Sequence, residues 1–115
     1  MKKDCEMSLQ GLPVAGGIAE GFAAVIQRPA DLGIVDRNTI LVCPYLSPVY
    51  LTVFSLIQGI VTEKGGVMSI AASIARENNL PAVAGILHGV NIINEGDLLR
   101  INGADGIVQI ISRAA

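Results

Sequence analysis

Residues 62–78 read Thr62-Glu63-Lys64-Gly65-Gly66-Val67-Met68-Ser69-Ile70-Ala71-Ala72-Ser73-Ile74-Ala75-Arg76-Glu77-Asn78. The short apolar run at 58–62 predicts a buried strand that leads into this stretch. Gly65-Gly66 then breaks the strand, because glycine adopts backbone angles that other residues avoid. Ser69 is suited to cap a helix N-terminus, and the Ala-rich segment 70–77 favours a helix. The stretch therefore predicts a strand, a glycine turn and a helix in succession.

This connection between strand and helix has two interpretations. A glycine turn before a helix N-terminus presents unpaired N–H groups and the positive end of the helix dipole. Gly65, Gly66 and Ser69 therefore form a candidate anion-binding site, with Arg76 as a further candidate on the same helix. The same residues are also typical of an ordinary tight connection, since short glycine motifs are common.

Length and composition favour one globular domain. The chain has 115 residues, of which 51% are hydrophobic and 3% aromatic, and 13 of them are glycines. This suits a compact α/β domain packed with small aliphatic side chains. A net charge of −2 without a basic run argues against nucleic acid or an anionic membrane as a partner. No apolar run is long enough for a membrane helix, and no signal peptide is recognisable, so we expect a cytoplasmic protein.

The two cysteines, Cys5 and Cys43, have neither metal-ligand spacing nor a secreted context. We expect two free thiols, and no metal or cofactor.

The rest of the chain supplies further strands. Residues 1–10 are polar, and we expect them to be frayed. The glycine-punctuated segment 11–21 predicts a loop or short strand, Ser47-Pro48 predicts the start of a helix over 49–57, and Asn78-Asn79 with Pro81 ends the helix at 70–77. The remaining predictions are strands at 22–27, 39–43 and 82–87, and a hairpin formed by 98–102 and 107–111.

The central stretch resembles the swivelling phosphohistidine domain of phosphoenolpyruvate-utilising enzymes, such as pyruvate phosphate dikinase, phosphoenolpyruvate synthase and rifampicin phosphotransferase. The pattern of that family is Gly-Gly-x-Thr-Ser-His-Ala-Ala-Ile-x-Ala-Arg-Glu, followed by Pro-Ala-Val-x-Gly. The matching residues of the first part fall in register without a gap, namely Gly65, Gly66, Ser69, Ala71, Ala72, Ala75, Arg76 and Glu77. Those of the second part, Pro81, Ala82, Val83 and Gly85, follow after three intervening residues. Weaker glycine matches extend the resemblance from Gly11 to about Ile111.

The resemblance implies a compact three-layer swivelling β/β/α domain over residues 11–112. It also implies a phosphorylated histidine where this chain has Ile70, and a threonine where it has Met68. The family's imidazole is a nucleophile that carries a phosphoryl group between two active sites. Isoleucine has no lone pair, so Ile70 is not competent for this step.

Two residues are candidate substitutes as phosphoryl acceptor. His88 is the only histidine, and it follows the strand at 82–87 just as Ile70 follows the strand at 58–62. If these strands are parallel, their ends share one edge of the sheet and the two residues are neighbours. The alternative for His88 is an exposed loop histidine, and the alternative for Ser69 is a helix cap. Arg76 is otherwise a surface ion-pair residue, with Glu77 or Glu63.

Three functions remain open, and whether the chain is an enzyme is undecided among them. The favoured one is a mobile-domain homologue that does not carry phosphate. It acts as a binding, regulatory or structural subunit beside separate nucleotide-binding and phosphoenolpyruvate- or pyruvate-binding chains or domains, or as a homo-oligomer. The second is a phosphotransfer subunit that uses His88 or Ser69. The third is a fold relative that binds another anion or small molecule near Gly65 and Ser69.

Overall fold

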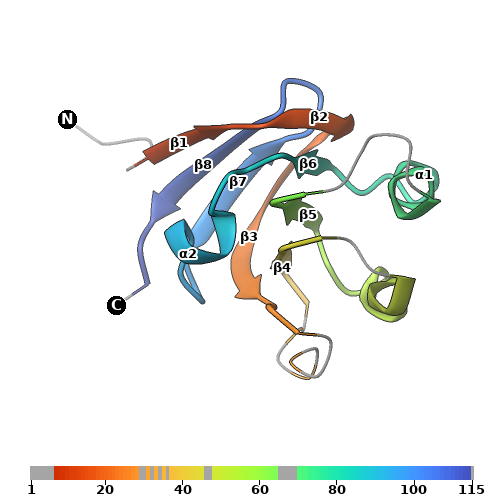
Figure 1. Cartoon of the computed structure of the whole chain (residues 1–115), viewed down its shortest axis with the longest axis horizontal. Coiled ribbons are helices and arrows are strands. Elements are labelled where there is room, and N and C mark those ends of the chain that lie inside the picture. The colour runs from red at the N-terminus through yellow and green to blue at the C-terminus, as the bar shows by residue number, and fades with distance from the viewer. Residues whose placement is uncertain are drawn as a thin grey trace.

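A computed structural model describes residues 7–28, 31, 33, 35, 37–45, 48–64 and 70–114 (Figure 1). Within these residues the chain forms one eight-stranded mixed sheet in the order β1-β8-β7-β3-β4-β5-β6-β2. The strands are β1 Met7–Gln10, β2 Leu12–Ala15, β3 Ile18–Val25, β4 Thr39–Cys43, β5 Gly59–Thr62, β6 Ala82–Ala84, β7 Leu98–Asn102 and β8 Ile107–Ser112. The helices are the 3-10 helix η2 Pro48–Val53, α1 Ile70–Glu77 and α2 Gly89–Ile92. The expected α/β class is confirmed.

The middle of the sheet is parallel. β3 pairs with β4, β4 with β5, and β5 with β6, all in parallel. All five residues of β4 are buried, as expected for a strand covered on both faces. Successive residues of β4 point to opposite faces, so that Leu41 and Cys43 belong to one core while Ile40 and Val42 belong to another.

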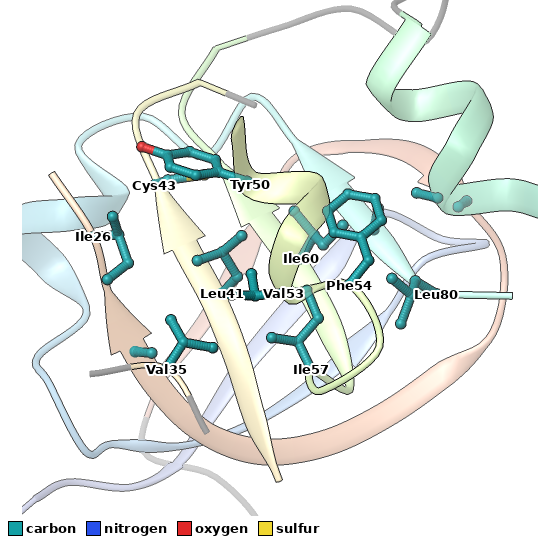
Figure 2. Packing of buried hydrophobic residues seen from close by; sticks show 14 residues of the cluster. Ile26, Val35, Leu41, Cys43, Tyr50, Val53, Phe54, Ile57, Ile60 and Leu80 are labelled. Carbon is teal, nitrogen blue, oxygen red and sulfur yellow. The ribbon is translucent and has the colours of Figure 1, made fainter. Parts of the chain in front are cut away.

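The first core lies between the parallel strands and the helices. Figure 2 shows Tyr50 and Val53 of η2, and Phe54 directly after it, packed over the side chains of β4 and β5. Ala75 of α1 and Leu80 belong to the same cluster. Burial of this apolar surface fixes η2 and α1 on one face of the sheet.

The second core lies on the opposite face of the parallel strands. Val61 and Val83 pack there in one cluster with Leu99, Ile101 and Ile110 of the antiparallel strands. The sheet is therefore folded over on itself, with β7, β8 and β1 forming a layer across from β4, β5 and β6. Together with the helices this gives the expected three-layer β/β/α arrangement.

The two ends of the sheet meet at Gly11. β1 pairs antiparallel with β8 and β2 with β6, so that the chain leaves one edge of the sheet and joins the other within a single residue. The backbones are too close there for side chains. A Cβ at Gly11 would overlap the carbonyl oxygen of Ala84, and the Gly11 N–H donates to Gly106 O at 2.7 Å. Gly106 has φ +72, which favours glycine.

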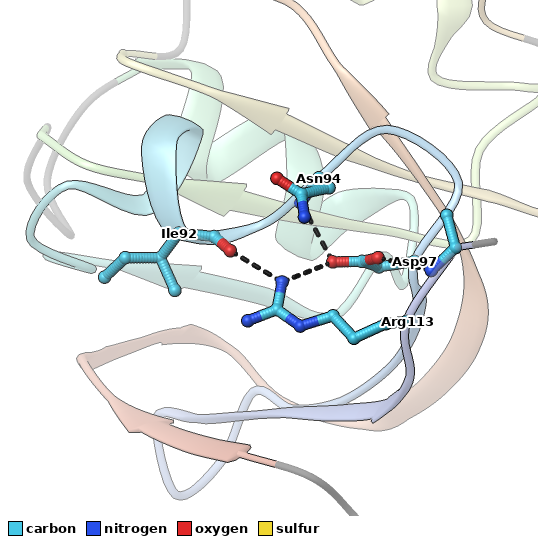
Figure 3. Close-up of polar contacts among 5 residues, drawn as sticks. Ile92, Asn94, Asp97 and Arg113 are labelled. Carbon is cyan, nitrogen blue, oxygen red and sulfur yellow. Dashed lines mark hydrogen bonds and ion pairs between the residues drawn. The ribbon is translucent and has the colours of Figure 1, made fainter.

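A buried carboxylate holds the C-terminal segment (Figure 3). Asp97 is fully buried, and its Oδ2 accepts hydrogen bonds from Asn94 N at 2.9 Å and Arg113 Nη1 at 2.8 Å. Its Oδ1 accepts one from Ala114 N at 2.8 Å. Arg113 Nη1 also donates to Ile92 O, at the end of α2. These bonds tie residues 113–114 to α2 and to the start of β7.

Several sequence predictions need correction. The polar sequence of residues 1–10 predicts fraying, but Met7–Gln10 is β1, ordered by antiparallel pairing with β8. The predicted helix over 49–57 is the 3-10 helix at 48–53, in keeping with its β-branched and aromatic residues, which favour the α-helix less than Ala does. The strand predicted at 22–27 is part of the longer β3. The strand predicted at 82–87 ends at Ala84, and α2 was not predicted.

Candidate functional site

The carboxyl ends of β4, β5 and β6 form the edge at which a site is expected in a parallel α/β sheet. Ile60 pairs with Ala82 and Val61 with Val83 in parallel register. The condition for the predicted proximity of His88 and Ile70, that the strands before and after the central helix are parallel, is therefore met. α1 follows β5 in the chain and begins at Ile70. The predicted anion-binding residues Gly65, Gly66 and Ser69 lie outside the described residues.

Glu63 connects the ends of β5 and β6. It directly follows β5, and its Oε2 accepts a hydrogen bond from Val90 N at 3.0 Å in the first turn of α2. The backbone adds a second link, because Ile86 N donates to Thr62 O at 3.1 Å. The segment that contains His88 is therefore fastened to the end of β5. From the sequence, Glu63 is expected only as an ion-pair partner of Arg76, since no local pattern links residues 27 positions apart.

His88 is an exposed residue at the start of α2. Its φ of 59 places it in the left-handed region, and its carbonyl oxygen accepts hydrogen bonds from Asn91 N and Ile92 N. Among the described residues, the imidazole has no hydrogen-bond partner. Proximity of His88 to Ile70 stays a prediction, although the strands that precede them are neighbours.

Cys43 and Tyr50 lie at the same edge but are poorly suited to nucleophilic chemistry. Burial, together with the Glu63 carboxylate, raises the pKa of the Cys43 thiol to about 12. Burial also raises the pKa of Tyr50, whose ring packs beside Cys43 in Figure 2. Since the thiolate is the reactive form of cysteine, Cys43 is inert near neutral pH. Cys43 is thus a free thiol, as expected from the sequence, and it is buried.

Arg76 lies at the other end of α1 from Ile70. Six residues at about 1.5 Å of rise each separate the two by roughly 9 Å along the helix axis. Arg76 Nε donates to Val14 O of β2 at 2.9 Å. This bond joins α1 to β2 and was not anticipated by either sequence interpretation of Arg76. It favours a structural role for the residue, and binding of an anion by Arg76 stays untested.

The edge also exposes large apolar side chains. Leu87, which follows β6, is 74% exposed, Tyr45, which follows β4, is 54% exposed, and Val49 at the start of η2 is 42% exposed. From the sequence, the apolar segment at 49–57 is expected to be buried against the sheet, and no pattern singles out Tyr45 or Leu87 as exposed.

The described residues contain no group of three or more His, Cys, Asp or Glu side chains arranged to hold a metal ion. Among the helices of the described part of the chain, none has the length and apolarity needed to cross a membrane.

Comparison with known proteins defines the class of this domain. Residues 35–106 match the family described as PEP-utilising enzyme, mobile domain. The chain belongs to this family, as the central motif predicted.

The relatives that match this chain over most of its length are much longer proteins. The chain is 38% identical over 104 residues to a rifampicin phosphotransferase of Bacillus cereus, covering 90% of this chain and 12% of that protein. It is 40% identical over 103 residues to the Bacillus subtilis rifampicin phosphotransferase, with the same coverage of 90% and 12%. The chain thus spans about an eighth of the length of these relatives.

Solved structures show the same fold. The Thermococcus kodakaraensis aconitase X in its holo-form has a chain that matches with a TM-score of 0.72 at 24% identity, covering 93% of this chain and 100% of that one. An NMR solution structure of Enzyme I matches with a TM-score of 0.59 at 27% identity, covering 69% of this chain and 33% of that one.

Proposed function

We propose that this domain is a member of the mobile-domain family that binds its partners but does not carry the phosphoryl group. The observation that carries the proposal is the identity of residue 70, an isoleucine, which is the first residue of α1. The family resemblance places the phosphorylated histidine at this position. An isoleucine side chain has no electron pair to attack phosphorus, so the transfer step has no acceptor there.

The other described nucleophiles at this edge support the proposal. The Cys43 thiol is protonated near neutral pH because its pKa is raised to about 12, and the Tyr50 hydroxyl is also held in its neutral form by burial. His88 is exposed, but no described side chain orients its imidazole or accepts a proton from it. An acceptor normally depends on such a neighbour for activation and alignment.

The exposed apolar residues of the edge support a docking role. Tyr45, Val49 and Leu87 give this edge an apolar character that favours contact with another protein surface. The partners we propose are the nucleotide-binding and phosphoenolpyruvate- or pyruvate-binding chains or domains of a phosphotransfer system. The length of the relatives supports this, because the chain matches only 12% of each rifampicin phosphotransferase. In this role the domain is a binding, regulatory or structural subunit.

Intact-mass spectrometry tests the proposal directly. The purified protein is incubated with ATP or phosphoenolpyruvate in extract of the cells that produce it, and its mass is then measured. We expect no added phosphoryl group on the natural chain. The matched variant Ile70→His should gain an acid-labile, base-stable phosphoryl group in the same extract. A phosphoryl group on the natural chain would overturn the proposal.

The alternative function is phosphotransfer through His88 or Ser69. The specific observation in favour of His88 is its exposure on a segment that Glu63 fastens to the end of β5. If the natural chain is labelled, His88→Ala and Ser69→Ala separate the two acceptors. If the phosphoryl group is acid-labile and is lost only in His88→Ala, then His88 is the acceptor. Label that survives acid and is lost only in Ser69→Ala assigns the serine.

A further inference from the structure

The outer face of β3 and β7 is a second surface, separate from the strand-end site. Ala19 and Ala23 of β3 pack toward the second core, so Ile18, Glu20 and Phe22 point the other way. Ile18 is 69% exposed and Phe22 is 53% exposed. Figure 1 shows η2 and α1 lying beside β4, β5 and β6, away from β7 and β8. This face therefore carries large apolar side chains that no described helix covers.

The strand register arranges this face in three rows. Ile18 lies opposite Asn102, Glu20 opposite Arg100, and Phe22 opposite Leu98. The central row is an ion pair, with Arg100 Nη2 2.6 Å from Glu20 Oε2 and Nε donating to the same oxygen at 2.8 Å. The face thus has a positive and a negative charge side by side, with Ile18 on one side of them and Phe22 on the other.

We propose that this face binds a second copy of this chain. A two-fold axis parallel to the strands, between β3 and β7, would place each residue of β3 over its own cross-strand partner in the other copy. Glu20 would then face Arg100 of the second copy, Arg100 would face Glu20, and Phe22 would face Leu98. A homodimer interface of this kind is isologous, so the one patch must complement itself. Two of its three rows do so, because opposite charges meet in the central row and Phe22 meets Leu98, while in the third row Ile18 meets Asn102.

Charge decides the orientation. A two-fold axis perpendicular to the strands through the central row would place Glu20 over Glu20 and Arg100 over Arg100, which is repulsive. The axis along the strands instead puts opposite charges together, and it also places Phe22 on Leu98. Two sheets packed in this way lie about 10 Å apart with their strands within about 30° of each other. This geometry leaves the strand-end site free, so the inference does not depend on the proposed function.

Two charge-reversal variants test the dimer by sedimentation velocity over a range of concentrations. We expect the natural chain to form a concentration-dependent dimer. Glu20→Arg alone should be monomeric, because the introduced guanidinium faces Arg100 in both halves of the interface, and Arg100→Glu alone should be monomeric for the corresponding reason. An equimolar mixture of the two variants should recover the dimer, because every facing pair is then opposite in charge. The ion pair between Glu20 and Arg100 within one chain cannot be restored by mixing two variant chains, so recovery of the dimer would report contacts between the copies.

Control variants separate this surface from a general effect of charge or folding. Glu77→Arg on α1 makes the same charge change on an exposed residue away from the face, and it should dimerise like the natural chain. Phe22→Ser changes only an exposed side chain and should weaken the dimer at least about tenfold while leaving the circular dichroism spectrum unchanged. A natural chain that stays monomeric throughout, or a dimer that survives both single reversals, would overturn the inference. Recovery on mixing supports it.

Discussion

At the scale of single residues, the buried carboxylate of Asp97 holds the C-terminal segment against the start of β7. It is fully buried, and three donors converge on its two oxygens: Arg113 Nη1, Asn94 N and Ala114 N. Asp97→Asn would remove the charge and point an amide donor at one of these groups. We expect unfolding free energy to fall by about 2–4 kcal/mol in urea titrations, because a buried charge partner is lost.

The exposed pair of Arg28 and Asp31 provides the control for Asp97. Arg28 Nη2 lies 3.7 Å from Asp31 Oδ1, and the side chains of Arg28 and Asp31 are 77% and 35% exposed. Asp31→Asn should change the unfolding free energy by no more than about 0.5 kcal/mol, since exposed ion pairs contribute little. An Asp97→Asn variant as stable as Asp31→Asn would show that the buried carboxylate does not anchor the C-terminal segment.

Cys43 makes stability depend on alkaline pH. In the folded state its pKa is raised to about 12, while in the unfolded chain the thiol ionises near 9. The contribution of the buried neutral thiol is complete below pH 9 and is lost as pH rises from 9 toward 12, by at most about 1.4 kcal/mol per pH unit. In a Cys5→Ser background, unfolding free energy should fall more steeply with pH in this window than in the matching Cys43→Ala protein. Equal slopes would contradict the burial of the thiol.

At the scale of elements, the crossing of β1 into β2 is the most constrained connection. A methyl group at Gly11 would overlap Ala84 O and lie 2.7 Å from Ile86 Cδ1. Gly11→Ala should therefore destabilise the fold by about 1–3 kcal/mol, through displacement of backbone that has no room to move. Gly33→Ala is the matched control, because nothing lies within 4 Å of a Cβ there, and it should be nearly neutral. Urea denaturation compares the two, and equal losses would contradict the tight crossing.

The helices and strands that could be predicted from the sequence are those that are specified by residues close together in the chain. β4, β5, α1 and the β7–β8 hairpin follow from runs of apolar residues, alanine content and turn residues, all within a few positions. β1 does not, because its polar sequence is ordered only by pairing with β8, far along the chain: Met7 lies opposite Ile110. α2 has four residues and is held by Glu63 from across the sheet edge. Such long-range causes leave no pattern in the local sequence.

The candidate site divides in the same way. The motif around Gly65 and Ile70 identified the family from sequence alone, while the site that it predicts at the end of β5 stays a prediction. The Glu63 bond to Val90, the burial of Cys43 and the exposure of Leu87 arise only once β4, β5 and β6 are side by side. Residue types such as Glu, Cys and Leu occur throughout proteins, so their presence in the sequence did not predict this hydrogen bond, this burial or this exposure.

At the scale of the whole molecule, the domain presents two surfaces built from different residues. The strand-end edge exposes Tyr45, Val49 and Leu87, while the outer face exposes Ile18 and Phe22. Because the two do not share residues, docking to a partner at the edge and pairing of two copies through the outer face are compatible.

A domain exchange tests the loss of the carrier in a complete enzyme. Residues 11–112 would replace the matching segment of the Bacillus subtilis rifampicin phosphotransferase, to which the chain is 40% identical over 103 residues. Since the resemblance implies that the enzyme's phosphoryl group passes through a histidine at this position, the exchanged enzyme should lose at least about 10³-fold in rifampicin phosphorylation, as expected for a missing nucleophile.

Ile70→His in the exchanged enzyme decides whether that loss is due to one side chain or to poor docking. Restoring the imidazole should recover most of the activity, because the fold and the docking edge are otherwise unchanged. His88→Ala added to this variant should leave the recovered activity intact. An exchanged enzyme that is active with Ile70, and inactive once His88 is removed, would instead show that the phosphoryl acceptor has moved to the neighbouring strand end.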